Sequence, residues 1–223
     1  MSAGSTAEYK MKSPKVAIID YEMCNLFSVN HACLKEGLTP IITRDPKEIL
    51  AADAVILPGV GAFGDAMKNL ERYELVDVIE DASRNKPFMG ICLGLQLLFE
   101  SSSEFGEHPG LGIVEGNVEK FPTVVEGRGI KVPHIGWNRV SFDPAEPIFD
   151  GIPNNSFFYF VHSYYVNPSD DRVVLTSTDY EGVNYCSAVK SDNMMAFQFH
   201  PEKSGVLGLK IYENWKRMIQ ARI

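Results

Sequence analysis

The segment Gly90-Ile91-Cys92-Leu93-Gly94 places a cysteine between two glycines, in the pattern G-x-C-x-G. An apolar run at residues 87–92 precedes the turn and helical spacing follows it, which is the context of a nucleophile elbow. The flanking positions of such a strained turn must be small, and the following helix N-terminus favours a thiolate. A single cysteine is more often a buried structural residue. Both glycines and the strand-to-helix context favour a nucleophile at Cys92.

A thiol nucleophile needs a base, and the chain has five histidines. His200 ends the apolar run at residues 194–201, where a parallel strand would deliver it beside Cys92 at the carboxyl edge of a sheet. Glu202 follows two residues later, at a spacing suited to orient the imidazole. A lone histidine is usually a surface or core residue. The nearby acid favours a Cys-His-Glu triad instead.

The stretch "ILPGVGAFG" at residues 56–64 satisfies the dinucleotide-binding pattern G-x-G-x-x-G. A dinucleotide-binding fold also needs an acidic residue at the end of the next strand, about 20 residues later. Residues 74–85 are predicted to be helical, so no strand is available there to carry this acidic residue. Acyl transfer needs backbone N–H groups aimed at an oxyanion, and glycines let the peptide approach the reacting carbon. The stretch therefore predicts an oxyanion site, with dinucleotide binding as the weaker alternative.

The elements that must position these residues alternate between apolar strands and amphipathic helices. The expected strands cover residues 15–21, 40–44, 54–58 and 87–92, and the expected helices cover 25–37, 45–50, 65–85 and 93–100. This rhythm predicts a parallel sheet covered on both faces. After about residue 101, short strands between turns predict antiparallel additions, including one at 157–166. An amphipathic helix at 208–223 closes the chain.

With these motifs in place, "GICLGLQLLF" and "FQFHPE" resemble the class I (triad) glutamine amidotransferase family from about Lys15 onward. The resemblance implies a flavodoxin-like α/β fold, with a mostly parallel central sheet flanked by helices and antiparallel additions in the second half. It also implies that Cys92 is the nucleophile, His200 the base and Glu202 its orienting acid. Gln96 would contact the substrate, L-glutamine. The implied oxyanion residues are Gly59, Val60 and Gly61, with the N–H of Leu93 as a second donor.

Within the family, "NLFSV", "LPGVGAFG", "KVPHIGWN", "YFVHSYY" and "FQFHPEKSG" resemble the glutaminase subunit of imidazole glycerol phosphate synthase. The resemblance implies that Ser163 and Tyr164 hold glutamine and that Glu104 receives its α-ammonium. It implies a heterodimer with a (β/α)8 cyclase subunit of histidine biosynthesis, to which ammonia is channelled. The residues implied at that interface and ammonia gate are Trp137, Asn138, Tyr159 and Lys203. Without the family, these aromatics would read as core or surface residues and the lysine as a solvated charge.

Three other interpretations remain open at this stage. A paralogous subunit could supply ammonia to a sugar-modifying amidotransferase of surface-polysaccharide synthesis. "IDYEMCNL" has Glu22 and Cys24 where the family has small glycines, which is compatible with such a paralogue. The second is a non-catalytic interaction subunit on the same fold, and the third is a cysteine peptidase. A cysteine peptidase on this fold lacks support from Gln96 and "PGVG".

Composition limits the remaining classes. The chain has 223 residues, 45% of them hydrophobic, and a formal net charge of −8, which argues against a nucleic-acid partner. No apolar run reaches the roughly 18 residues of a membrane span, and residues 1–15 lack the apolar region of a signal peptide. Four cysteines without zinc spacing favour a cytoplasmic protein with reduced thiols, no metal and no cofactor. We expect a disordered lead-in at 1–12 and a single domain at 13–223.

Overall fold

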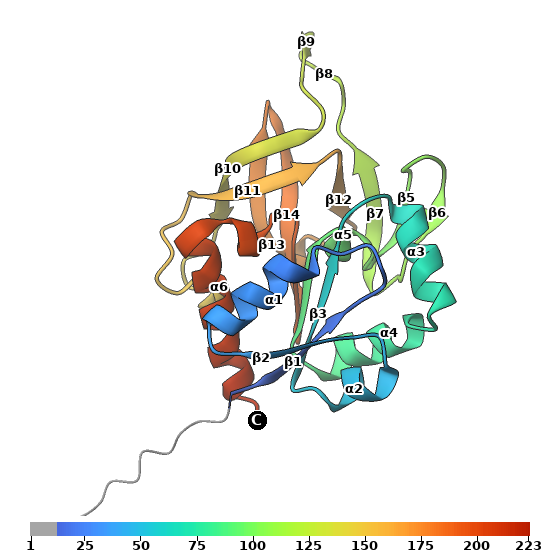
Figure 1. Ribbon diagram of the computed structural model, residues 1–223. Helices are drawn as coiled ribbons and strands as arrows, with labels where there is room; N and C mark the ends of the chain where they lie inside the picture. Colours follow the sequence, from blue (N-terminus) through green and yellow to red (C-terminus); the bar gives the residue numbers. More distant parts are fainter. Residues whose placement is uncertain (1–12) are drawn as a thin grey trace, which may run out of the picture.

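The computed structural model describes residues 13–223, so the expected lead-in at 1–12 lies outside the described residues (Figure 1). Its centre is a sheet of 13 strands. One half of this sheet is parallel, in the order β2-β1-β3-β4-β15. The five strands are β1 (Lys15–Ile19), β2 (Thr39–Thr43), β3 (Ala54–Gly59), β4 (Phe88–Cys92) and β15 (Met194–Phe197). Strands β3, β4 and β15 are buried at every residue, as expected for a sheet covered on both faces.

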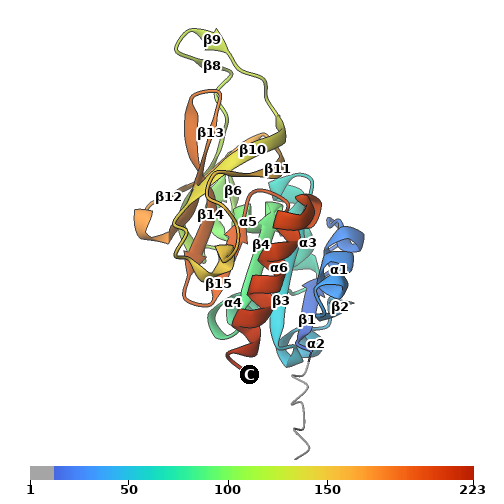
Figure 2. The ribbon, with the colours of Figure 1, turned by 90° about the vertical axis from the view of Figure 1, so that its left-hand side faces the viewer.

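Helices cover the two faces of this parallel half (Figures 1 and 2). On one face, Ile18 and Ile56 pack with α1 (Leu26–Lys35) and α6 (Gly205–Gln220). On the other face, the alternate residues Ile19 and Leu57 pack in a second core. That core is closed by α2 (Pro46–Ala51), α3 (Phe63–Arg72) and α4 (Val76–Asn85). Successive strand residues point to opposite faces, so each strand contributes to both cores.

The second half of the chain extends the sheet beyond β15 with mainly antiparallel pairs, as predicted. In sequence order, its elements are α5 (Leu93–Gln96), β5 (Phe99–Ser102), β6 (His108–Pro109), β7 (Val114–Lys120), β8 (Val124–Val125), β9 (Arg128–Gly129), β10 (His134–Phe142), η1 (Pro147–Phe149), β11 (Ser156–His162), β12 (Tyr164–Pro168), η2 (Asp171–Val173), β13 (Val174–Tyr180), β14 (Val183–Ser191) and η3 (Pro201–Lys203). The β10–β11 ribbon crosses the end of the molecule where the parallel strands finish, and the β8–β9 hairpin projects past it (Figure 2).

Three expected elements are shorter than their patterns. The helix predicted at 65–85 is broken between α3 and α4, where Glu74 has a φ of 55° and Leu75 turns into the core. The helix predicted at 93–100 stops at Gln96, because Phe99 already pairs with Val114 in the sheet. The strand predicted at 157–166 is interrupted at residue 163. In the two helices, a tertiary contact of Leu75 or Phe99 ends a run that the local pattern would continue.

None of the helices among residues 13–223 is long and apolar enough to cross a membrane.

Candidate active site

The register of three parallel strands brings the predicted catalytic segments to one edge. Gly59, at the end of β3, is opposite Cys92, at the end of β4. On the other side of β4, Ile91 pairs with Phe197, the last residue of β15. Carboxyl ends of parallel strands meet at the same edge of a sheet, which is where open α/β sheets bind ligands. The nucleophile strand therefore lies between the glycine-rich loop and the segment that carries His200.

Cys92 has the strained backbone of a nucleophile elbow, with φ 55° and ψ −111°. A Cβ on Gly94 would lie 1.9 Å from the carbonyl oxygen of Leu57, and one on Gly90 would lie 2.8 Å from Cβ of Ala196. Neither flanking position can carry a side chain, which is the steric reason for the G-x-C-x-G pattern. The helix that follows has only four residues, so its dipole is shorter than the sequence pattern predicted.

His200 and Glu202 form a buried pair. Nδ1 of His200 lies 2.7 Å from Oε1 of Glu202, and the two side chains are 2% and 1% exposed. Nε2 of His200 is buried and has no hydrogen-bond partner among residues 13–223. Burial alone would lower the pKa of His200, but its interactions with the neighbouring Cys92 and with Glu202 raise it to about 10. The imidazole is thus oriented by the acid and keeps one nitrogen available for proton transfer.

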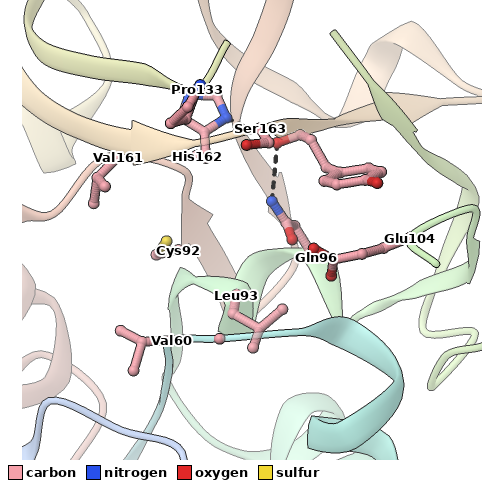
Figure 3. Close-up of a pocket in the computed structure, with 11 residues that line it drawn as sticks. Val60, Cys92, Leu93, Gln96, Glu104, Pro133, Val161, His162 and Ser163 are labelled. Carbon is pink, nitrogen blue, oxygen red and sulfur yellow. Dashed lines mark hydrogen bonds between the residues drawn. The ribbon is translucent and has the colours of Figure 1, made fainter.

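A pocket of about 310 Å³ opens above Cys92 (Figure 3). Eight of its lining residues belong to the predicted site: Val60, Gly61, Cys92, Leu93, Gln96, Glu104, Ser163 and Tyr164. Pro133, Val161 and His162 also line it and were not assigned a role by sequence. Gly59, His200 and Glu202 lie outside the lining. The fold therefore gathers residues from the loop after β3, the end of β4, α5 and the β11–β12 turn around one cavity.

The side chains predicted to hold the substrate have defined partners. Oε2 of Glu104 accepts a hydrogen bond of 2.6 Å from the N–H of Phe63, the first residue of α3. The carboxylate thus caps this helix as well as lining the pocket. Burial, together with the charge of Glu104, raises the pKa of Tyr164. Nε2 of Gln96 donates to the carbonyl of Tyr164 at 3.0 Å (Figure 3). It also donates to Oε1 of Gln198 at 3.0 Å. Gln96 therefore has only its Oε1 left for a ligand.

The oxyanion loop does not present all of its predicted donors. The N–H of Val60 donates to the carbonyl of Met23 at 2.8 Å, so in this conformation it is not free for an oxyanion. The next residue, Gly61, has a φ of 99°, and a Cβ there would lie 2.6 Å from Cε of Met23. The N–H of Leu93, at the start of α5, has no acceptor within that helix. Of the two expected donors, the N–H of Val60 is therefore engaged by Met23, whereas the N–H of Leu93 has no acceptor in α5.

The two departures from the family's glycines are accommodated in the loop after β1. Glu22 adopts the left-handed φ of 72° that a glycine would take without strain, and its carboxylate contacts Arg44 and Tyr73. Sγ of Cys24 lies 3.6 Å from the carbonyl oxygens of both Ile19 and Pro58. Burial raises the pKa of this thiol to about 12, so it stays protonated at neutral pH.

The predicted interface residues occupy different faces. Trp137 on β10 pairs with Tyr159 on β11, with their rings 6.2 Å apart, and the tryptophan is 54% exposed. Asn138 points to the opposite side of β10, because neighbouring strand residues alternate, and its Nδ2 donates to the carbonyl of Asp179 at 2.7 Å. Lys203, in η3, forms no ion pair with a residue in 13–223. Asn138 thus does not share the outward face of Trp137, contrary to the expected grouping.

Two buried histidines connect this ribbon to the pocket wall. Nδ1 of His134 lies 3.3 Å from Nε2 of His162, and the hydroxyl of Tyr185 lies within 3.3 Å of both nitrogens. Burial lowers the pKa of His134 to about 4 and that of His162 to about 3, so both rings are neutral at neutral pH. His162 and Gln198 lie in the quoted motifs "YFVHSYY" and "FQFHPE", but local sequence carried no sign of their partners.

Comparison with known proteins agrees with this geometry. Residues 17–216 match the family described as glutamine amidotransferase class-I. The chain therefore belongs to the class I glutamine amidotransferases, and the resemblance drawn from its motifs is confirmed. These proteins are enzymes, so the expected enzyme class is confirmed too.

Similar chains narrow the comparison. The chain is 51% identical to the imidazole glycerol phosphate synthase subunit HisH of Aquifex aeolicus (strain VF5), over 91% of this chain and 96% of that one. It is 48% identical to the subunit of the same name from Sulfurimonas denitrificans, over 91% and 97%.

Solved structures agree on the fold. PurLQS from Thermotoga maritima matches with a TM-score of 0.70 at 18% identity, covering 93% of this chain and 99% of that chain. A glutamine amidotransferase from the same organism matches with a TM-score of 0.59 at 17% identity, covering 95% and 86%. These likenesses confirm the expected fold class.

Proposed function

We propose that this protein is the glutaminase subunit of an imidazole glycerol phosphate synthase. It hydrolyses L-glutamine to glutamate and ammonia, and a cyclase subunit consumes the ammonia in histidine biosynthesis. The observation that carries the proposal is the placement of Cys92, on a strained elbow at the base of the pocket, beside the buried His200–Glu202 pair. The names of the relatives support this pathway over surface-polysaccharide synthesis.

In the proposed reaction, the Cys92 thiolate attacks the side-chain amide carbon of glutamine. The amide oxygen becomes the oxyanion, and Nε2 of His200 gives its proton to the departing ammonia. A water molecule then gives a proton back to His200 and attacks the thioester, which releases glutamate and restores the thiolate. Glu202 keeps the ring in the tautomer and orientation that both steps need. No external oxidant, metal or cofactor enters this balance.

Substrate recognition is assigned to the other polar groups of the pocket. Glu104 supplies a carboxylate for the α-ammonium of glutamine, and Oε1 of Gln96 can accept from its side-chain amide. Ser163 and Tyr164 close the wall beyond them. A pocket of about 310 Å³ has room for one amino acid such as glutamine.

Activity of the lone chain is expected to be low in this conformation. The hydrogen bond from Val60 N–H to Met23 removes one oxyanion donor, and rotation of the Gly59–Val60 peptide would return it to the site. We assign that rotation to the partner-bound state. The subunit would then hydrolyse glutamine only when the ammonia has a consumer.

The partner is expected to dock on the outward face of the β10–β11 ribbon. Alternate residues of these strands expose large apolar side chains next to the pocket, and Val161 belongs to both surfaces. The exposed members are Ile135, Trp137, Phe157 and Val161, with Tyr159 half-buried among them. We propose a heterodimer in which a (β/α)8 cyclase subunit covers this face, with Trp137 and Tyr159 at the ammonia passage. Lys203 follows the active-site strand at the same end.

We also assign the protein to the cytoplasm, because all four cysteines are unpaired and the proposed nucleophile must stay reduced. The proposal is tested by measuring glutamate release with the cyclase subunit of an imidazole glycerol phosphate synthase and its nucleotide substrate. Stimulated release that disappears in Cys92→Ala, but survives in Cys186→Ala at a half-buried position of β14, supports it. Labelling of Cys92 by a glutamine-like electrophile without any stimulation would move the partner to sugar modification. Unchanged glutamate release by the complex with Cys92→Ala would favour the alternative that this protein is a non-catalytic subunit.

A further inference from the structure

Gln198 is a buried polar residue with no part in the reaction described above. It follows β15, is 0% exposed and does not line the pocket. Its Nε2 lies 3.8 Å from Sγ of Cys92, within hydrogen-bonding distance for sulfur. It also lies two residues before His200, so the same segment supplies a contact to the nucleophile and the base.

The direction of this amide is dictated by its neighbours. A backbone carbonyl can only accept, so the atom of Gln96 that faces the carbonyl of Tyr164 must be its NH₂ group. The same NH₂ group also donates to Gln198, so the atom of Gln198 that faces it must be the acceptor Oε1. The NH₂ group of Gln198 is left to point at the sulfur. The carbonyl of Tyr164 can only accept, so it fixes the orientation of both side-chain amides in this chain of hydrogen bonds.

The anchor of this chain is itself held rigidly. The carbonyl of Tyr164 accepts a second hydrogen bond, of 2.8 Å, from Nδ1 of His162. Gln96 is 6% exposed and Gln198 is fully buried, so little water competes for these groups. Polar groups in such a dry network cannot exchange partners without leaving one unsatisfied.

We propose that Gln198 is a positioning residue for the nucleophile: its N–H donates to the Cys92 sulfur and favours the thiolate, and Gln96 and Tyr164 fix the direction of that donor. Donation to an anion is stronger than donation to a neutral thiol, so the contact selects the reactive form. The inference rests on the proposed role of Cys92. The amide of Gln198, which follows β15, thus gives the sulfur a hydrogen-bond donor in addition to the backbone of the elbow.

The test compares the pH dependence of Cys92 alkylation by iodoacetamide, followed at the Cys92 peptide by mass spectrometry, in the full-length chain. Gln198→Met keeps the length of the side chain but removes the donor, and we expect the alkylation profile to move about one unit to higher pH. Glutaminase kcat, measured with the cyclase subunit, should fall about tenfold, with KM for glutamine changed less than about twofold. Asn214→Leu, which removes another buried amide on α6, should leave the profile in place.

Gln198→Glu is the second variant, because its carboxylate accepts from Gln96 as the amide does but adds negative charge beside the sulfur. Its profile should move to higher pH by more than that of Gln198→Met. Profiles that coincide with wild type in both variants would overturn the inference, as would a raised KM at unchanged kcat. Absence of glutamate release by the wild-type complex would instead refute the proposed function, and the alkylation profiles would still decide the role of Gln198.

Discussion

Nδ1 of His200 lies 2.7 Å from Oε1 of Glu202, and both side chains are almost completely buried, so the imidazole has one fixed orientation. Its other nitrogen is left without a partner among residues 13–223, next to Cys92. A buried polar atom without a partner is unfavourable for stability, and a role in proton transfer beside Cys92 explains why this one is retained. This arrangement leads to the first prediction.

Glu202→Gln should lower glutaminase kcat by roughly 10²- to 10⁴-fold and leave KM for glutamine nearly unchanged. The amide can still contact Nδ1, but it removes the negative charge that stabilises the imidazolium. The measurement is steady-state glutamate release with the cyclase subunit present. A variant that changes KM alone would place Glu202 in substrate binding instead. Glu213→Gln, on the surface of α6, is the control for losing one carboxylate.

Val60→Pro should strongly lower glutaminase activity even with the partner bound, because proline has no N–H to offer an oxyanion. Loss of one such donor costs about 10²- to 10³-fold in kcat. Val60→Ala keeps the N–H and should retain most of the activity. The reaction of Cys92 with iodoacetamide should continue in both variants, since it needs no oxyanion donor. Substantial activity in the proline variant would exclude the Val60 N–H from the reaction.

Trp137→Ala should loosen the coupling between the two active sites. Its ring is exposed on the face proposed for the partner, beside Tyr159, and its removal would open a path for ammonia to water. The measurement is the ratio of glutamate released to cyclase product formed, which should rise above that of wild type. Phe157→Ala removes similar apolar area from the same face and should weaken association without leakage. An unchanged ratio in Trp137→Ala would argue against a gate at this position.

Stability should fall as the pH falls from about 6.5 toward 4. Burial lowers the pKa of His162 to about 3 and that of His134 to about 4, whereas both rings titrate near 6.5 in an unfolded chain. The unfolded chain therefore binds more protons in this window, and unfolding becomes easier by about 1.4 kcal/mol per pH unit for each ring. His200 has a raised pKa and is protonated in both states there. Its stabilising contribution is present below about pH 6.5 and is lost as the pH rises toward 10.

His162→Gln should remove one of the two groups that bind a proton in the unfolded chain but not in the folded chain at this pH. The slope of unfolding free energy between pH 6 and 4.5, from urea denaturation, should then be about 1.4 kcal/mol per unit smaller than in wild type. His31→Gln, at an exposed position of α1, should keep the wild-type slope. Equal slopes in all three proteins would mean that His162 is not held neutral by the fold.

Local sequence was sufficient wherever the physical constraint was local. The steric demand of the elbow is expressed in Gly90 and Gly94, which cannot carry a Cβ where Ala196 and Leu57 approach them. The parallel half of the sheet followed from the alternation of buried strands and amphipathic helices. Where a contact from a distant segment ended an element, as Val114 does for the helix after Cys92, the local pattern extended too far.

The resemblance to the family assigned the triad and the substrate residues to positions in this sequence. The tertiary structure decided which hydrogen-bond partners these residues have. The N–H of Val60 is bound by Met23, 37 residues earlier in the chain, and Gln198 reaches Cys92 across 106 positions. Asn138 and Trp137 are neighbours in sequence yet face opposite sides of β10. Sequence by itself determined the chemical groups and the order of the elements. The register and packing of the sheet alone decided which groups face the pocket, because hydrogen bonds between distant segments leave no local pattern.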